Sequence, residues 1–330
     1  MLENLEKLRV HLPPLDAGWL KKFAVLIMVI DHVTYAFLER VYTADGRAIL
    51  FSISGGKLLD SIGRAVGRQA FPIFCFFLVE GFLHTRSRLR YFGRLVFFAA
   101  LSQYPFQKAF FPRSDTLHAN VLVTMALGFL SIWILEELGN VFLKEGEGPV
   151  PAEKRNSFKA CESPVLAEKQ DSLREGERPA SAEKRDSLRE YENPAPVEKR
   201  DSGSGGERDG TGQGRAYRSL FYRFCWLFAG SGAVFGFCSL ANMLHSDYRY
   251  GGVLTIVLLY LFYKYRITSL CVSWAWLSWY NRLELYSAPA FYLLACYNGK
   301  RGKQSKYFFY VFYPAHLLVL WLLRRHFFGL

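Results

Sequence analysis

Long apolar runs separated by short polar or basic segments make up most of the chain. The run at residues 19–38, WLKKFAVLIMVIDHVTYAFL, has the length of roughly 20 residues that a helix needs to cross a bilayer. Further apolar runs lie at residues 62–84, 91–111, 117–138, 219–244, 250–265, 267–280, 284–297 and 307–323. This pattern predicts an all-α fold, a polytopic membrane helical bundle of about eight or nine transmembrane helices.

A polar segment interrupts the apolar runs at residues 144–218. It is rich in Pro, Glu, Lys, Arg, Ser and Gly, and it repeats every 15 residues, as shown by Pro149, Pro164, Pro179 and Pro194. Such a segment cannot bury an apolar face, so we expect a disordered insertion. The predicted organisation is a cytoplasmic lead, an N-terminal membrane half, this insertion and a C-terminal membrane half, at residues 1–18, 19–143, 144–218 and 219–330.

The charge of the chain is concentrated in and beside the apolar runs. The formal net charge is +12, whereas the 14 basic and 14 acidic residues of residues 149–218 cancel. Basic residues beside membrane helices set topology and meet anionic lipid head groups, which favours the lipid bilayer over nucleic acid as the partner. The positive-inside rule places the basic segment 86–94, the N-terminus and the insertion in the cytoplasm. We therefore expect a multi-pass protein of the cell (inner) membrane.

The cysteines do not predict a disulfide framework or a metal site. There are six of them, five of which lie in apolar runs, and no two form a CxxC pair. We therefore expect no metal cofactor. The first residues also lack the apolar core of a signal peptide, so we expect the run at residues 19–38 to stay in the mature protein.

Asp31 and His32 lie side by side near the middle of the first apolar run. Ionisable groups at that depth are costly and are usually paired and functional. Adjacent helical residues point about 100° apart. We therefore expect one of the two to reach a reaction centre while the other pairs across the bundle. Histidine is the usual general base near neutral pH; a purely structural hydrogen-bonded pair is the alternative.

Arg64 and Arg68 are four residues apart and share a helix face. Each is a candidate partner for Asp31, a candidate ligand for phosphate or carboxylate, or an anchor at the membrane interface. Glu80 and His84 have the same spacing near the predicted cytoplasmic end of their run, where a solvated helix cap is the alternative to a functional role.

Arg86, Arg88 and Arg90 begin the basic segment that follows the second run. They are candidates for binding the phosphates of a nucleotide-containing donor, although any cytoplasmic loop has such a composition. His316, next but one to Pro314 in the last run, is a second intramembrane histidine and a second candidate base.

Other motifs carry little chemistry. His245 and Asp247 lie in a short turn that we interpret as a surface turn. The sequence contains no GxGxxG after a strand, no P-loop and no GxSxG.

Several stretches together resemble the TraX family of membrane proteins, named for the conjugal-transfer protein that acetylates the N-terminus of F-type pilin. They are LIMVIDHVTYAF (26–37), IGRAVGRQAFPIFCFFLVEGFLHTRSRLRYFGRL (62–95), SQYPF (102–106), NVLVTMALG (120–128), DYRYGGVL (247–254) and FYPAHLLVL (312–320). The family looks similar in plan to transmembrane acyltransferases, which take an acyl group from cytoplasmic acyl-CoA and use a membrane-buried histidine. The resemblance therefore implies acetyl-CoA as the donor; the repeat insertion is the main departure from the family pattern.

Together these features predict a membrane-embedded, acyl-CoA-dependent N- or O-acetyltransferase that acts on a protein or envelope glycan. His32 is the expected base, with Asp31 fixing the local charge and His316 as the alternative base. The expected substrate- or donor-binding residues are Arg64, Arg68, Glu80, Arg86, Arg88, Arg90 and His316. A proton-coupled transporter using Asp31, His32, Glu80 and His316 as a relay is one alternative, and a structural partner in a secretion or conjugation apparatus is another.

Overall fold

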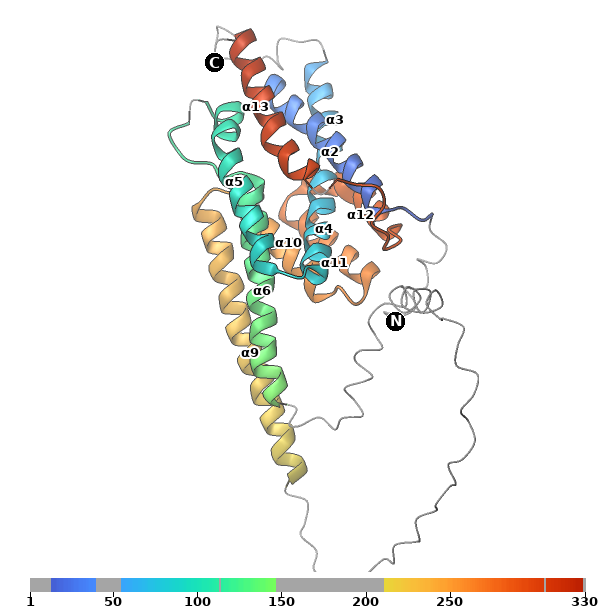
Figure 1. The fold of residues 1–330 in the computed structure, drawn as a ribbon, viewed down its shortest axis with the longest axis vertical. Coiled ribbons are helices and arrows are strands. Elements are labelled where there is room, and N and C mark those ends of the chain that lie inside the picture. Colours follow the sequence, from blue (N-terminus) through green and yellow to red (C-terminus); the bar gives the residue numbers. More distant parts are fainter. Residues whose placement is uncertain (1–12, 40–54, 113, 147–210, 306, 329–330) are drawn as a thin grey trace, which may run out of the picture. The chain divides into compact units, whose positions relative to one another are not determined.

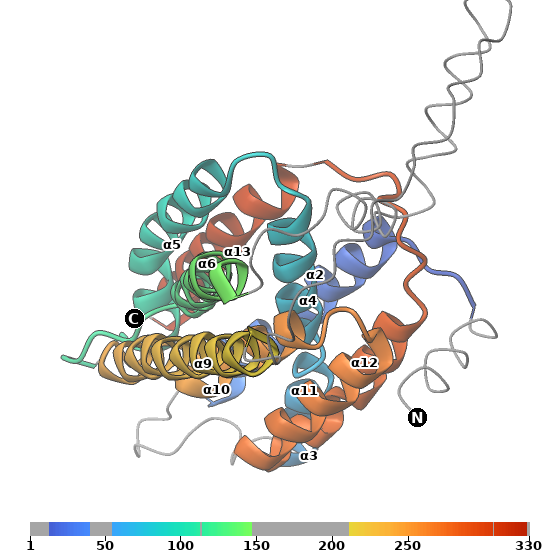
Figure 2. The same cartoon turned by 90° about the horizontal axis from the view of Figure 1, so that it is seen from below.

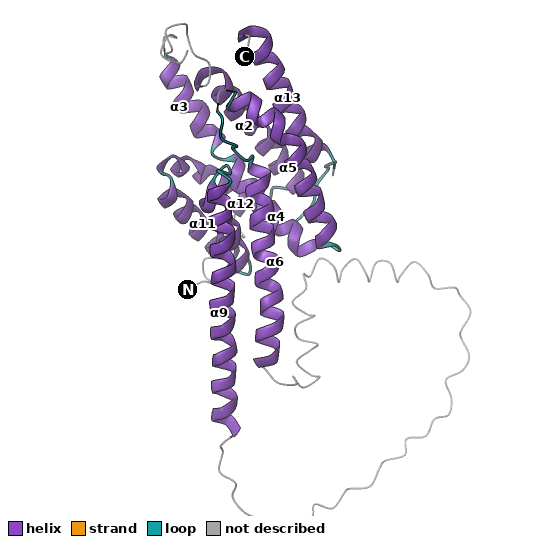
Figure 3. Cartoon of the chain, turned by 90° about the vertical axis from the view of Figure 1, so that its left-hand side faces the viewer, coloured by secondary structure: helices purple, strands orange, loops and turns teal. Residues whose placement is uncertain are grey.

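The computed structural model describes residues 13–39, 55–112, 114–146, 211–305 and 307–328. Within these ranges the chain is helical, and the one extended feature is an isolated bridge between Leu15 and Tyr297 (Figure 1 and Figure 3). The all-α prediction is thus confirmed for the described residues. The elements are α2 (Ala17–Thr34), the π-helix η2 (Tyr35–Glu39), α3 (Gly56–Gly67), α4 (Ala70–His84), α5 (Arg88–Phe110), α6 (Val121–Gly146), α9 (Thr211–Met243), α10 (Arg249–Leu261), α11 (Arg266–Tyr280), the 3₁₀ helix η4 (Arg282–Ser287), α12 (Ala288–Ala295) and α13 (Phe308–Phe328).

The chain divides into two compact units. The first comprises Met1–Leu138 and Leu227–Leu330, and the second comprises Gly139–Trp226. What is described of the second unit is the end of α6 and the beginning of α9. Every site residue discussed below belongs to the first unit.

Most of the predicted insertion, residues 147–210, lies outside the described residues. At its edges, α6 continues to Gly146 and α9 begins at Thr211. Both helices therefore extend a few residues into the segment that we predicted to be disordered. Helices of this length tolerate polar residues at their ends, where the first and last turns are held by the rest of the helix.

Three helical stretches are long and apolar enough to cross a membrane: Gly56–His84, Val121–Phe142 and Ser219–Met243. This number, which refers to the described residues, is lower than the eight or nine that we predicted. The helices α10, α11 and α12 have 13, 15 and 8 residues, and at about 1.5 Å per residue none of them crosses a bilayer alone. Apolar runs therefore overestimated the number of full spans for two reasons. Three runs fold into short helices, and α2, α5 and α13, with 18, 23 and 21 residues, are long enough but not apolar enough.

Helix α4 is the centre of the first unit. Ten of its 15 residues are buried, and it contacts α2, α10 and α12. Viewed end-on, α4 lies among these helices (Figure 2). Around this centre α13 packs along α5, and α2 packs along α3. Helix α2 also contacts α13, so it has helices from the beginning and from the end of the chain as neighbours.

The boundary between α3 and α4 falls at Arg68 because of Pro72. A proline in a helix cannot donate a hydrogen bond to the carbonyl four residues earlier, and its ring crowds that carbonyl. For Pro72 that carbonyl belongs to Arg68, where α3 is capped and the chain turns before α4 begins at Ala70. The proline thus determines that Arg68 is the residue at which α3 ends.

The beginning of α2 is fastened to the segment that precedes α13. Asp16 caps the helix by accepting a hydrogen bond from the backbone N–H of Trp19 at 2.8 Å. The N–H of Leu15 donates to Cys296 O at 2.9 Å, and the N–H of Ala17 donates to Lys300 O at 3.0 Å. These bonds set the position of α2 along its axis relative to the segment 296–300.

Helix α3 approaches α2 through two glycines. Gly63 and Gly67 are four residues apart, the small-xxx-small spacing that lets membrane helices come close together. A Cβ added at Gly63 would overlap the side chain of Thr34, and one added at Gly67 would overlap the Cβ and carboxylate of Asp31. The close approach brings the residues that follow these glycines, Arg64 and Arg68, to the level of Asp31.

We predict that Gly67→Ala destabilises the protein by about 1–3 kcal/mol, because the new methyl group must displace Asp31 and the helix that carries it. The matched control is Gly93→Ala in α5, where an added Cβ meets open space. That substitution should be neutral or should stabilise by about 0.5–1 kcal/mol, since alanine favours helix over glycine. The measurement is thermal unfolding of both variants in detergent. Equal melting temperatures for the two variants would contradict the tight α2–α3 contact.

Candidate functional site

Asp31 is held by two guanidinium groups from α3 and its end. Arg64 Nη1 donates to Asp31 Oδ1 at 2.7 Å, and Arg68 Nη2 lies 3.6 Å from the same oxygen. Arg64 Nε also lies 3.0 Å from Glu39 Oε1. The pairing of Asp31 with the two arginines is the arrangement that the sequence predicted across the bundle.

Glu284 extends this network on the side of η4. Arg68 Nη1 donates to Glu284 Oε1 at 3.2 Å, and the glutamate is fully buried. The five residues Asp31, Glu39, Arg64, Arg68 and Glu284, hereafter the ion-pair cluster, thus bring three carboxylates to two guanidinium groups. Sequence reasoning missed Glu284 because it lies at the edge of an apolar run. The position of Glu284 beside an apolar run did indicate a buried ion pair, since an acidic residue there needs a partner.

His32 points to a different neighbour from Asp31. Its Nδ1 lies 2.7 Å from Nε2 of His316 on α13, and the two ring planes are 9° apart. We call these two residues the histidine pair. Asp31 thus pairs across the bundle, and the partner of His32 is the second intramembrane histidine. That His32 reaches a reaction centre stays a prediction.

The hydrogen bonds of His316 fix its tautomer. Its Nδ1 lies 3.0 Å from the carbonyl oxygen of Phe312, and a carbonyl oxygen only accepts. In the neutral ring Nδ1 therefore carries the proton and Nε2 accepts. The Nδ1 of His32 must then be the donor to His316, which leaves the lone pair of His32 Nε2 available. By this argument His32 is the member of the pair that can take up a proton.

A cavity of about 130 Å³ lies next to the ion-pair cluster and the histidine pair. We call it the polar cavity because Asp31, His32, Arg64, Arg68 and Asp247 line it together with aromatic residues. Asp247 thus contributes to the cavity instead of serving only in a surface turn, as we had interpreted it.

The turn before α10 is shaped to present Tyr248 to this cavity. His245, Tyr248 and Arg249 have φ values of 46°, 62° and 41°, which is strained backbone for residues other than glycine. The ring of Tyr248 stacks on Phe71 with centroids 3.7 Å apart, and Arg68 lies 5.6 Å from its centroid. This arrangement could not be predicted from the sequence, because backbone strain and ring stacking are tertiary effects.

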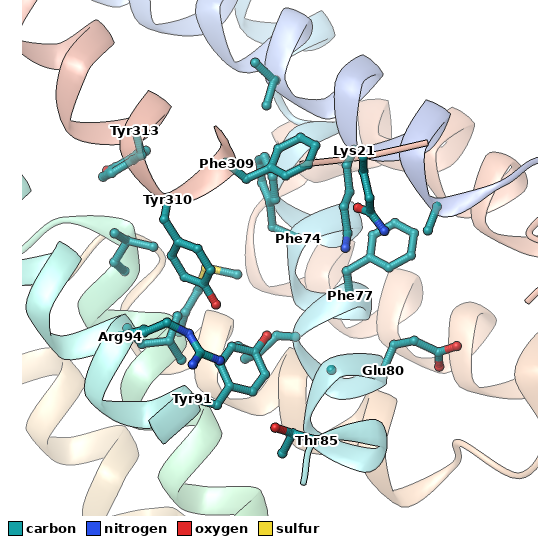
Figure 4. A pocket seen from close by; sticks show the side chains of 18 of the residues that line it. Lys21, Phe74, Phe77, Glu80, Thr85, Tyr91, Arg94, Phe309, Tyr310 and Tyr313 are labelled. Atoms are coloured by element: carbon teal, nitrogen blue, oxygen red, sulfur yellow. The ribbon is translucent and has the colours of Figure 1, made fainter. Parts of the chain in front are cut away.

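A second, larger cavity of about 600 Å³ lies among α2, α4, α5 and α13. We call it the basic cavity because Lys21, Arg94 and Arg301 line it. Figure 4 shows Lys21, Phe77 and Phe309 on one side of it and Tyr91, Arg94 and Tyr310 on the other. The Nε of Arg94 is buried and has no hydrogen-bond partner among the described residues. A buried donor of this kind is usually bonded to a water or an ion, and the same guanidinium is hydrogen-bonded to the hydroxyl of Tyr310.

Glu80 also lines the basic cavity. Its carboxylate accepts a hydrogen bond from the hydroxyl of Tyr263. His84, the other member of the predicted helical pair, is exposed and bonds to the backbone carbonyl of Glu80 at 2.8 Å instead of to its carboxylate. The structure therefore brings both Glu80 and His84 to the lining of the basic cavity, but their side chains are not paired with each other.

The three arginines predicted to bind a donor lie elsewhere. Arg86 and Arg90 are exposed, and neither is among the described residues that line the basic cavity. Arg88 is paired with Glu136 at 2.5 Å and with Glu137 at 3.3 Å. The next arginine along the same helix, Arg94, is the one that reaches the cavity.

The sequence of the chain matches a known protein family. The family model for the TraX protein matches residues 17–142 and 225–324, which is well over half of the chain. This chain belongs to the TraX family. The match covers both membrane halves and stops at the edges of the insertion, and it includes every residue of the histidine pair and the ion-pair cluster.

This chain is similar to the probable fimbrial assembly protein FimC, serogroup H1, of Dichelobacter nodosus. The two are 35% identical over 138 residues, a region that covers 39% of this chain and 50% of the relative. The chain thus spans about half the length of that relative. No solved structure matches the chain.

For the ion-pair cluster we predict a large energetic coupling between Arg68 and Glu284. Removing one partner of a buried pair costs about 3–5 kcal/mol because the other charge stays buried and unpaired. Arg68→Gln should therefore be strongly destabilising, and adding Glu284→Gln should recover part of the loss. The control cycle uses the more exposed pair Arg88 and Glu136, for which we expect a coupling of about 1 kcal/mol or less. Denaturant unfolding of both cycles in detergent measures the two coupling energies, and equal values would contradict the account.

Proposed function

We propose that this protein is a membrane-embedded acyltransferase that uses acetyl-CoA or a similar acyl-CoA and acylates an amine or hydroxyl acceptor. The observation that carries the proposal is the histidine pair, His32 and His316, which lies beside the half-buried Asp31. A histidine with a free nitrogen, oriented by a second group through its other nitrogen, is the arrangement that general-base catalysis requires. Membership of the TraX family supports the same reaction class.

The proposed step moves one proton and one acyl group. The acceptor's nitrogen or oxygen attacks the thioester carbonyl while His32 Nε2 takes its proton. The carbon–sulfur bond then breaks, and the departing thiolate receives that proton from His32. His316 holds the ring of His32 in the required tautomer throughout, through the bond between His32 Nδ1 and His316 Nε2.

In this proposal Arg64 and Arg68 organise the site instead of binding the donor's phosphates. Both guanidinium groups are already engaged with carboxylates at 2.7–3.6 Å. Bound in this way, they hold the carboxylate of Asp31 in place next to His32 in the chain. A fixed charge in a site that excludes water contributes more to catalysis than the same charge in water.

The donor's phosphates would instead occupy the basic cavity. Lys21, Arg94 and Arg301 supply three cations, and a volume of about 600 Å³ is within the range of small-molecule sites, roughly 300–1,000 Å³. Arg94 belongs to the basic segment 86–94 that the positive-inside rule assigns to the cytoplasm. We therefore propose an inner-membrane orientation in which the basic cavity opens to the cytoplasm and the polar cavity, with Asp247, faces the opposite side.

The relative's name favours an acceptor connected with surface fibres. FimC of Dichelobacter nodosus is named as a probable fimbrial assembly protein. We propose a fimbrial or pilus protein as one acceptor to be tested, with an envelope glycan as the other.

We predict that His32→Ala lowers acyl-CoA turnover by about 10²–10⁴-fold, the usual contribution of a general base. The measurement is release of the CoA thiol by purified protein in lipid, with acetyl-CoA as donor. The control is His326→Ala, an exposed histidine at the other end of α13, which should leave turnover unchanged. Full turnover in His32→Ala would contradict the assignment. Substrate flux into vesicles without acyl-CoA turnover would support the transporter instead.

For the donor site we predict that Arg94→Gln or Arg301→Gln raises the KM for acyl-CoA about 10–100-fold, since hydrogen bonds to charged groups contribute about 1.5–3 kcal/mol. Arg86→Gln, which removes an exposed charge from the same basic segment, should leave the KM unchanged. Initial rates over a series of acyl-CoA concentrations provide the test. A larger effect of Arg86→Gln would place the phosphates on the segment 86–90.

A further inference from the structure

The basic cavity and the polar cavity share a wall of four apolar side chains. Met28 from α2, Phe74 from α4, and Val121 and Met125 from α6 line both cavities. We call these four residues the dividing wall. Its two methionines are each 7% exposed, so both are packed inside the protein and not on its surface.

The dividing wall lies next to the histidine pair. Tyr313 lines the basic cavity, and its ring centroid lies 6.3 Å from that of His32 and 5.4 Å from that of His316. Met28 and His32 are one helical turn apart on α2, and both line the polar cavity. A thioester arm that enters from the basic cavity must therefore pass the wall to bring its carbonyl to His32.

The dividing wall combines flexible side chains with stiff ones. Methionine is unbranched and adapts to neighbouring shapes at low cost, whereas phenylalanine and valine keep their form. Beyond the wall, the polar cavity offers about 130 Å³. A cavity of about 150 Å³ holds a molecule the size of benzene. The space near His32 therefore accepts a short acyl group and excludes a long one.

We propose that the dividing wall, and Met28 and Met125 in particular, determines which acyl chain the enzyme transfers. In this proposal, which rests on the acyltransferase function proposed above, the two methionines part to admit an acetyl or similarly short group and close the passage to longer chains. The four residues act as specificity-determining residues and take no part in proton transfer.

The test is a comparison of acetyl-, butyryl- and hexanoyl-CoA as donors for Met28→Ala, Met125→Ala and the wild type. Each methylene in an apolar pocket changes discrimination by about 10–200-fold. We expect the ratio of kcat/KM for hexanoyl- to acetyl-CoA to rise at least tenfold in each variant. The control is Met243→Ala, in which the residue is 76% exposed on α9 and the ratio should stay at the wild-type value.

A second pair of variants keeps the proposal testable if the alanine variants do not fold. Met28→Leu and Met125→Leu conserve volume but replace flexible side chains with branched ones. They should reduce turnover of butyryl-CoA more than that of acetyl-CoA. Turnover with an unchanged chain-length preference in all four variants would overturn the role of the wall. Absence of turnover with every donor in the wild type would instead overturn the proposed function.

Discussion

The ion pair between Asp31 and the arginines at positions 64 and 68 is the interaction on which the site depends. A carboxylate within an apolar helix is tolerated only when a countercharge and hydrogen bonds reach it. Here the backbone geometry of α3 brings the two positively charged arginines close to Asp31. The glycines of α3 allow the helices to approach, and Pro72 ends α3 at the residue that bridges Asp31 and Glu284. With Asp31 held by α3, the next residue, His32, faces α13.

Part of this arrangement could be predicted from the sequence. The depth of Asp31 and the four-residue spacing of the arginines were enough to make Arg64 and Arg68 candidate partners of Asp31, one of several roles that the sequence left open for them. The helical rotation between Asp31 and His32 was enough to predict that they have different partners. Both predictions rest on local geometry and on the cost of an unpaired charge, and these are properties that a single sequence contains.

Other features depend on tertiary contacts and could not be predicted. The choice of Arg94 over its neighbours follows from which face of α5 meets α13. The role of Tyr248 depends on three residues with positive φ, and that of Glu284 on the course of a short 3₁₀ helix. The number of spans was overestimated for a similar reason. Hydropathy identifies apolar segments, but packing decides whether a segment forms a full helix or a short one.

The two cavities give the first unit two different chemical environments, one on each side of the dividing wall. The basic cavity has cations and aromatic rings suited to a large anionic ligand, while the polar cavity has carboxylates, guanidinium groups and little space. Such an asymmetry fits a reaction with one large and one small partner group. Helix α2 contributes residues to both cavities, whereas α13 contributes residues to the basic cavity and places His316 against His32.

The central claim is that His32 and His316 act as one unit. The most direct test is to compare CoA release from acetyl-CoA for His32→Ala, His316→Ala and the double variant. If the pair works as a unit, the double variant loses no more activity than His32→Ala alone, because residues that act together are not additive. Losses that multiply in the double variant would show that the two histidines act independently, and would contradict the account.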